Sequence, residues 1–342
     1  MKPEHSYVVA LEGGGSKTVT LAADLAGQVV AWGRGGSSLT LYVSDEDAIG
    51  AIEAALDAVT APIDPERVGI VCLAMVGSGY SADPAGPLAR RFPHARIVSI
   101  GEGQAAAVGA MLEYRGAVAS AGTGSFGHAV GEGGKVGHAG GHGPLVGDEG
   151  SGYWVSVEAV RRAFWSLDAR AEPTVLVERI RAHYGLRNLW EIIGRLYGPR
   201  RMSRHEVASL SPVVVAAAED GDAGAQAVLE GAADQLARMA VAAIEQVRRA
   251  GDGWEGPIPL SCTGGLGLGA PSLRAAVGRR VSERVPEVEW VGPYLPAVGG
   301  CLVEALRQAG MVVEGEVVAR LRRTLPAEVG APRVAVTAGS TA

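Results

Sequence analysis

One glycine-rich motif occurs twice in this chain, and its repetition restricts the possible folds more than any other feature. Gly13–Ser16 has the sequence GGGS and Gly122–Ser125 has GTGS, so three of four positions agree at a separation of 109 residues. Each motif follows an apolar run typical of a buried strand and precedes another such run. A strand, a glycine loop and a strand that recur together indicate two similar α/β units that face each other.

The first unit is expected over residues 1–115. Ser44, with Asp47 three positions later, has the spacing of a capping box and marks a predicted helix start. Short strands, rich in β-branched and apolar residues, are predicted before and after this helix at 7–11, 19–24, 28–32, 68–73 and 96–100. A helix of small residues at 103–114 completes a mixed α/β domain.

The second unit is expected over residues 116–295 and contains more helix than the first. Strands are predicted at 116–120, 127–130, 258–262 and 288–291, and helices at 150–165, 175–183, 189–197, 204–218, 222–250 and 272–284. A third glycine loop is expected at 263–267. The helical segment 296–325 is predicted to rejoin the first unit, and residues 326–342 to form a frayed tail.

Charge and composition exclude several classes of protein. The formal net charge of −6 over 342 residues disfavours a nucleic-acid binder, which usually carries a basic surplus. The apolar runs are far shorter than a bilayer span, and the first residues lack the apolar core of a signal peptide. The three cysteines are widely separated and form neither a disulfide framework nor a metal-binding pair. We therefore expect a cytoplasmic protein with no nucleic-acid or membrane partner.

The glycine loops raise the question of phosphate binding. Gly13–Thr18 is not a Walker A loop, because Ser16 stands where that pattern requires a glycine before the lysine. Gly122–Gly127 matches GxGxxG, but a strand follows it instead of the helix that a dinucleotide site needs. Glycine loops can also present successive N–H groups to an anion. The alternative is that they are tight turns requiring positive φ. As a pair, with the third loop, they favour phosphates.

The segment Gly141–Trp154 is the densest candidate site. It places Asp148 and Glu149 between glycines, at the expected start of a helix. Capping of that helix is the simpler explanation for one carboxylate. Capping does not require the surrounding glycines, whereas close approach of the backbone to a ligand does. We therefore expect a functional site here.

These motifs carry a family resemblance. Leu11–Thr18, Gly122–Ser125 and Gly141–Trp154, with its string GDEGSGYW, resemble the N-acetylglucosamine kinase branch of the BadF/BadG/BcrA/BcrD ATPase family. That family belongs to the actin-like, sugar-kinase and Hsp70 superfamily. The resemblance covers most of the chain and implies two ribonuclease-H-like (actin-like ATPase) domains around an interdomain cleft. It also implies an ATP-dependent kinase of a hexose or amino sugar, with Mg²⁺ and a homodimeric assembly.

The resemblance assigns roles to individual residues. Glu12 would lie near Mg²⁺ and hold it through water, Glu102 would be the general base, and Asp148 would bind sugar hydroxyls. Gly141 and His142 would lie beside the sugar ring. A larger set would contact ATP, namely Gly13, Gly14, Gly15, Ser16, Lys17, Thr18, Thr123, Gly124, Ser125, Gly221, Gly264, Gly265 and Leu266.

Four positions depart from the family pattern around the acceptor. Glu102 replaces the usual aspartate, Leu39 and Phe126 stand where asparagines are common, and His142 replaces a tryptophan. The changes suggest a different acceptor, which Leu39 and Phe126 would contact. They also leave open an alternative, a nucleotide-binding regulator without sugar turnover.

Two other features have simpler explanations. His138 and His142 have a spacing that metal ligands use on helices, but glycines make a helix there unexpected. The arginines between 195 and 204 are expected to form a solvated basic face.

Overall fold

A computed structural model of the protein describes residues 5–77 and 79–330. It contains two five-stranded mixed sheets, and their strand orders are β3-β2-β1-β4-β5 and β10-β9-β6-β7-β8. The strands of the first sheet are β1 (Tyr7–Gly13), β2 (Thr18–Asp24), β3 (Val29–Gly35), β4 (Val68–Met75) and β5 (Arg96–Ser99). Those of the second are β6 (Gly116–Ala121), β7 (Ser125–Val130), β8 (Val136–Gly140), β9 (Ile258–Thr263) and β10 (Val288–Trp290).

The two sheets have the same topology. In each, the first three strands form an antiparallel meander, and the fourth and fifth strands add in parallel on the other side of the first. The repeat expected from the two glycine motifs is therefore confirmed at the level of whole sheets. The sequence did not predict β8, an edge strand that contains two glycines.

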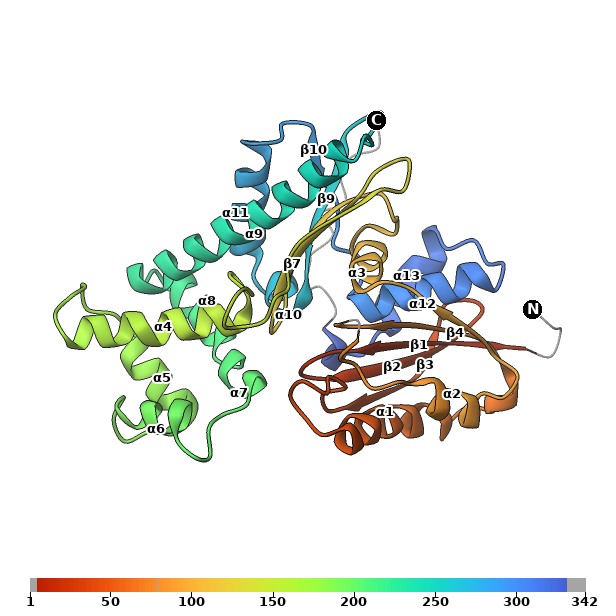
Figure 1. Ribbon diagram of the computed structural model, residues 1–342, viewed down its shortest axis with the longest axis horizontal. Helices are drawn as coiled ribbons and strands as arrows, with labels where there is room; N and C mark the ends of the chain where they lie inside the picture. The colour runs from red at the N-terminus through yellow and green to blue at the C-terminus, as the bar shows by residue number, and fades with distance from the viewer. Residues whose placement is uncertain (1–4, 78, 331–342) are drawn as a thin grey trace.

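The first sheet is covered on both faces, as the unbroken apolar run Tyr7–Leu11 of β1 requires. Val9 and Leu11 pack towards α1 (Asp45–Thr60) and α2 (Ala85–Arg91), whereas Val8 and Ala10 pack towards α12 (Ala297–Gln308) and α13 (Gly315–Thr324). Figure 1 shows α1 and α2 below this sheet and α12 and α13 above it. Ser44 caps α1 by accepting from the N–H of Asp47, as predicted.

α3 (Glu102–Met111) lies between the two cores (Figure 1). Ala105 and Val108 face the first core, while Ala106 and Met111 pack against strands of the second sheet. Burial on both sides explains why the helix consists almost entirely of small and apolar residues and shows little amphipathic pattern. The chain passes to the second sheet directly after α3. The domain limits at 115 and 295 stay predictions.

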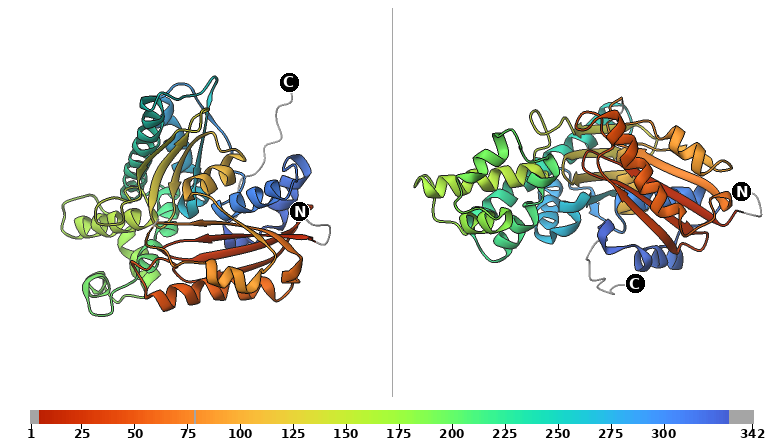
Figure 2. Two further views of the ribbon diagram at one scale, coloured as in Figure 1. Left: turned by 45° about the vertical axis from the view of Figure 1, so that its right-hand side comes forward. Right: turned by 90° about the horizontal axis from the view of Figure 1, so that it is seen from below.

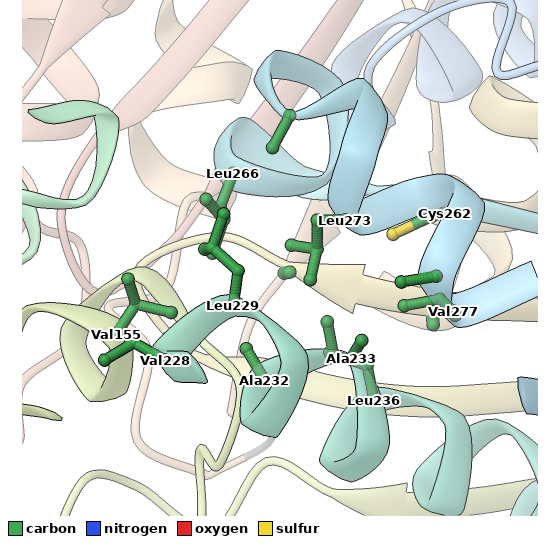
Figure 3. Packing of buried hydrophobic residues seen from close by; sticks show 14 of the residues in the cluster. Val155, Val228, Leu229, Ala232, Ala233, Leu236, Cys262, Leu266, Leu273 and Val277 are labelled. Carbon is green, nitrogen blue, oxygen red and sulfur yellow. The ribbon is translucent and has the colours of Figure 1, made fainter. Parts of the chain in front are cut away.

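The second sheet carries α9 (Ala223–Arg249) and α11 (Pro271–Ser282), whose apolar side chains interlock (Figure 3). A helical segment between β8 and α9 projects away from the first sheet (Figures 1 and 2). It comprises α4 (Gly152–Leu167), α5 (Leu176–Tyr184), α6 (Glu191–Tyr197), α7 (Arg204–Ala208) and α8 (Ser211–Glu219).

Two sequence predictions are wrong in this half. The helix expected over 204–218 is divided into α7 and α8, because Pro212 has no N–H to bond the carbonyl of Ala208. The Ser211 hydroxyl donates to that carbonyl instead, at 2.9 Å. The third glycine loop is also not a loop, because its glycines begin the short helix α10 (Gly264–Gly269).

The remaining elements are short. Two single turns of 3₁₀-helix occur at Pro65–Arg67 and Ala327–Val329, and Val329 of the second is buried. Residues 331–342 of the predicted tail lie outside the described residues. Within the described part of the chain, every helix is too short or too polar to cross a bilayer.

Candidate functional site

The two glycine loops meet where the sheets approach each other. Ser16, between β1 and β2, donates from Oγ to Oγ1 of Thr123, between β6 and β7, over 2.9 Å. Within residues 5–77 and 79–330, the backbone N–H groups of Gly15, Ser16, Thr123 and Gly124 donate to no other group of the chain. The structure thus brings together the two motifs that lie 109 residues apart in sequence.

Neither loop needs its glycines for a left-handed backbone, since none of Gly13, Gly14, Gly15, Gly122 and Gly124 has positive φ. The tight-turn explanation is therefore wrong. A Cβ on Gly13 would lie 2.5 Å from Cε of Met75, and one on Gly124 would lie 2.9 Å from Oδ1 of Asp148, so close packing explains these two.

Gly14 and Gly122 have no such explanation. Their nearest neighbours would be 3.5 Å and 3.9 Å from an added Cβ, and the neighbours are carbonyl oxygens of the same loops. The chain itself gives no packing reason for glycine at these two positions.

Asp148 is the most constrained residue of the site. It is 3% exposed and has a φ of 59°, which is rare for a residue other than glycine. Its Oδ1 accepts from the N–H of Ser125 over 3.3 Å, and its Oδ2 accepts from Nη2 of Arg204 over 2.6 Å. Burial raises the pKa of Asp148, and the Arg204 charge opposes that rise.

The capping explanation for Asp148 is also wrong. Ser151 is the N-cap of α4, and its side chain accepts from the N–H of Trp154 over 3.1 Å. Asp148 lies three residues before this cap. Its carboxylate instead points at the second glycine loop and Arg204, so the helix does not account for it.

Arg204 was not predicted as a site residue and does not belong to a solvated face. Its side chain is 16% exposed, and its guanidinium lies over the ring of Tyr42, 4.7 Å from the ring centre. In sequence, nothing separates Arg204 from the neighbouring arginines. Its partner Asp148 is 56 residues away, so only the fold reveals the pair.

Two further carboxylates belong to this part of the structure. Glu12 lies at the end of β1, beside the backbone of Val298 in the first turn of α12. Burial raises the pKa of Glu12, and the charge of Lys17 opposes the rise. Glu102 is the first residue of α3. Burial raises its pKa to about 8, and the charges of Glu12 and Asp148 add to this effect.

Glu102, which directly precedes the helix predicted at 103–114, is thus the N-terminal residue of that helix. That position usually favours an ionised carboxylate. The pKa is raised nevertheless, so burial and the neighbouring charges outweigh the helix dipole. A carboxylate whose pKa lies near neutral pH has the proton affinity that general bases need.

The remaining predicted acceptor contacts differ in exposure. Leu39 and Phe126 are 5% and 6% exposed, and Phe126 stacks on His138 with ring centres 5.4 Å apart. Their burial favours a packing role. Gly141 and His142 lie exposed on the segment before Asp148. Contact of these four residues with a sugar stays a prediction.

The predicted adenosine contacts lie in two places. Gly221 has φ of 92° and joins α8 to α9, whereas Gly264 packs so closely on Ala121 that a Cβ would lie 2.5 Å from its carbonyl carbon. Gly265 has free space around it. The side chain of Leu266 is 7% exposed and belongs to the second core (Figure 3), so only its backbone is available to a nucleotide.

Hydroxyl groups near the loops fall into two classes. Thr18 Oγ1 is occupied, because it donates to the carbonyl of Gly36 over 3.0 Å. Ser38 Oγ, next to Gly13, and Thr263 Oγ1, at the end of β9, are buried without a partner among the described residues. Buried polar groups in native proteins usually find a partner, so both are candidates for ligand contact.

A separate cavity of about 170 Å³ lies among α4, α5, α6 and α7 and is lined mainly by apolar side chains such as Phe164, Ile192 and Leu196. It does not include the glycine loops or the three carboxylates.

Comparison with known proteins identifies the family of this chain and proteins of similar sequence and fold. The model of the BadF/BadG/BcrA/BcrD ATPase family matches residues 11–303. The chain belongs to this family. It is also 26% identical over 253 residues to N-acetylmuramic acid/N-acetylglucosamine kinase of Clostridium acetobutylicum, with coverage of 70% of this chain and 79% of that protein.

Two solved structures share the fold of this BadF/BadG/BcrA/BcrD ATPase family member. Both are described as putative N-acetylglucosamine kinases. The Chromobacterium violaceum protein has a TM-score of 0.64 and 24% identity, covering 89% of this chain and all of that one. The Porphyromonas gingivalis protein has a TM-score of 0.64 and 19% identity, with the same coverage. The predicted pair of ribonuclease-H-like domains is confirmed.

Proposed function

We propose that this protein is an ATP-dependent kinase that phosphorylates a hexose or amino sugar of the N-acetylglucosamine class. Membership of an ATPase family supports the use of ATP. The three similar proteins reported above are named for the phosphorylation of N-acetylglucosamine or N-acetylmuramic acid. The proposal rests mainly on the two facing glycine loops, whose backbone N–H groups have no acceptor among the described residues.

The loops suit a polyphosphate. Gly15, Ser16, Thr123 and Gly124 present backbone N–H groups from two sides of one junction, and these groups have no acceptor among the described residues. A phosphate that approaches closely would be obstructed by side chains at Gly14 and Gly122, which explains glycine where packing does not. We assign the β- and γ-phosphates to this junction.

The same junction fits Mg²⁺. This ion keeps several waters and binds through one or two carboxylates together with substrate phosphates. Glu12 offers a carboxylate beside the first loop. Among the described residues, no group of three or more acidic, histidine or cysteine side chains is arranged to hold a metal alone. Bound Mg²⁺ would neutralise phosphate charge, and Glu12 would hold it through water.

Glu102 and Asp148 would act on the acceptor. Asp148, paired with Arg204, would accept hydrogen bonds from sugar hydroxyls and orient the sugar. Glu102, whose pKa is about 8, would accept the proton of the attacking hydroxyl. Phosphoryl transfer depends mainly on positioning and charge stabilisation, and both are supplied here by few residues. The proposal also includes a cytoplasmic location and a homodimer.

A panel assay tests the proposal. Purified protein is mixed with Mg-ATP and, one at a time, N-acetylglucosamine, N-acetylmuramic acid, glucosamine and glucose, and ADP release is followed by a coupled enzyme assay. We expect sugar-dependent ADP release with at least one amino sugar. Nucleotide binding without sugar-dependent turnover of any member would contradict the proposal and indicate a nucleotide-binding regulator.

A further inference from the structure

Arg204 connects the acceptor side of the site with the first glycine loop. Its Nη2 pairs with Asp148 over 2.6 Å, while Nη1 lies 3.5 Å from the position that a Cβ on Gly15 would occupy. Its guanidinium also covers the ring of Tyr42, which belongs to the first half of the chain. One side chain thus pairs with the residue assigned to the sugar and lies beside the loop assigned to the phosphates.

The ion pair does not use all the hydrogen-bonding capacity of this side chain. A guanidinium has five N–H donors, and Nε of Arg204 is buried without a partner among the described residues. Leaving a buried donor unpaired is costly, so such groups in functional sites often mark ligand contacts. Of the two terminal nitrogens of Arg204, Nη2 pairs with Asp148 and Nη1 lies towards Gly15.

The charges around Arg204 also call for a cation. Glu12, Glu102 and Asp148 lie close enough that the charges of Glu12 and Asp148 contribute to the raised pKa of Glu102. A nucleotide would add the charge of its phosphates to this acidic group. Arg204 is held by a well-formed helix start, because Ser203 and Glu206 make a capping box around it.

We propose that Arg204 contacts the phosphoryl group during transfer and stabilises the charge on its oxygens. This inference rests on the proposed function. In the step, the bond between the γ-phosphorus and the bridging oxygen of ATP breaks, and a bond to the acceptor hydroxyl oxygen forms. The hydroxyl proton passes to Glu102, and ADP leaves. Arg204 neither gains nor loses a proton.

A simpler role must be separated from this one, namely that Arg204 only holds Asp148. A double-mutant cycle distinguishes them. If Arg204 acts only through Asp148, then Arg204→Ala has no further effect on kcat once Asp148→Asn is present. If it contacts the phosphoryl group, Arg204→Ala lowers kcat at least about tenfold in that background as well. In the otherwise wild-type chain we expect a loss of about 10²–10³-fold.

Two further variants make the cycle interpretable. Arg204→Lys keeps the charge but loses the planar fork, and we expect partial recovery of kcat relative to Arg204→Ala. Arg195→Ala removes an exposed arginine and is expected to leave kcat within twofold of wild type. If Arg204→Ala does not fold because Asp148 loses its partner, the double variant and Asp148→Asn still give the decisive comparison.

A second measurement does not depend on sugar turnover. Binding of Mg-ADP with aluminium fluoride, which mimics a phosphoryl group in transfer, is measured by calorimetry without sugar. Arg204→Ala should weaken this binding at least tenfold while binding of Mg-ADP alone stays within twofold. Equal loss for both ligands, or no loss for either, would overturn the inference. If the wild type phosphorylates no sugar, the proposed function fails, and this measurement alone decides the role of Arg204.

Discussion

Replacement of Glu102 by glutamine should change both the stability of the fold and the rate of the proposed reaction. Glutamine is nearly isosteric with the protonated glutamate but cannot ionise. The pKa of Glu102 rises from 4.5 to about 8 in the folded protein, mainly because of burial. The folded state therefore holds the proton more tightly than the unfolded state does. Wild-type stability should fall as pH rises from about 4.5 through about 8 and then become constant.

The size of this effect follows from the same values. Each unit of pKa corresponds to about 1.4 kcal/mol. A rise from 4.5 to about 8 thus corresponds to about 5 kcal/mol at pH 9, an upper value because Glu102 is partly accessible to water. We expect Glu102→Gln to match the wild type within about 1 kcal/mol at pH 5 and to be more stable by at least about 2 kcal/mol at pH 9.

Activity should change in the opposite direction. Loss of a general base lowers kcat by about 10²–10⁴-fold, while Mg-ATP affinity should change little. In the wild type, kcat/KM should rise about tenfold per pH unit between pH 6 and 8 and level off above about 8, as the base ionises.

Urea unfolding at pH 5, 7 and 9 and pH–rate profiles measure both effects, with the exposed Glu255→Gln as control. A stability difference that is the same at pH 5 and pH 9 would show that Glu102 does not titrate in this range. Turnover of Glu102→Gln at the wild-type rate would refute its role as the base.

Three other predictions follow from the site. Millimolar Mg-ATP should raise the melting temperature by several degrees in a thermal scan, because a ligand concentration of 100 times Kd stabilises the native state by about 2.7 kcal/mol. An unchanged melting temperature would contradict nucleotide binding. Asp148→Asn should lower the free energy of unfolding by about 3 kcal/mol, because it weakens the buried pair with Arg204. It should also reduce acceptor phosphorylation at least about tenfold while Mg-ATP binding is retained. Full turnover in a destabilised variant would indicate that Asp148 has a structural role only. Gly124→Ala should displace the Asp148 carboxylate, which would lie 2.9 Å from the new methyl group, so the free energy of unfolding should fall by about 1–3 kcal/mol and most of the activity should be lost in the same two assays. Gly50→Ala, which places its methyl group in free space, should leave activity unchanged. Equal activity of the two variants would contradict a packing role for Gly124.

Local sequence signals predicted the parts of the fold that depend on neighbouring residues. Apolar runs bounded by glycines gave the strands around both loops, and the repeated motif indicated two units of one topology. Ser44 marked the first helix because its cap bonds lie within three residues. Pro212 was the available signal for the break between α7 and α8, since a proline cannot donate the bond that a continuous helix needs.

The parts that sequence could not predict depend on distant partners. β8 is held by pairing with β7 and lies at the sheet edge, so its own glycine-rich residues carry little strand signal. Gly264 and Gly267 of α10 lie against Ala121 of β6, which precedes them by more than 100 residues. In sequence, Arg204 cannot be told from the other arginines of its segment. Only the fold shows that it contacts Asp148 and Tyr42. The raised pKa of Glu102 likewise results from burial and from charges on other elements.

Phosphorus NMR of one reaction mixture shows whether the protein transfers the γ-phosphate of ATP to a sugar. The sample contains the protein, Mg-ATP and the amino sugar that gives the fastest ADP release, with Glu102→Gln as the parallel sample. We expect the γ-phosphate signal of ATP to be replaced by that of a sugar phosphomonoester, one for each ADP formed. The variant should show almost no such signal in the same time. Release of inorganic phosphate in place of the phosphomonoester, or unchanged ATP, would contradict the assignment as a sugar kinase.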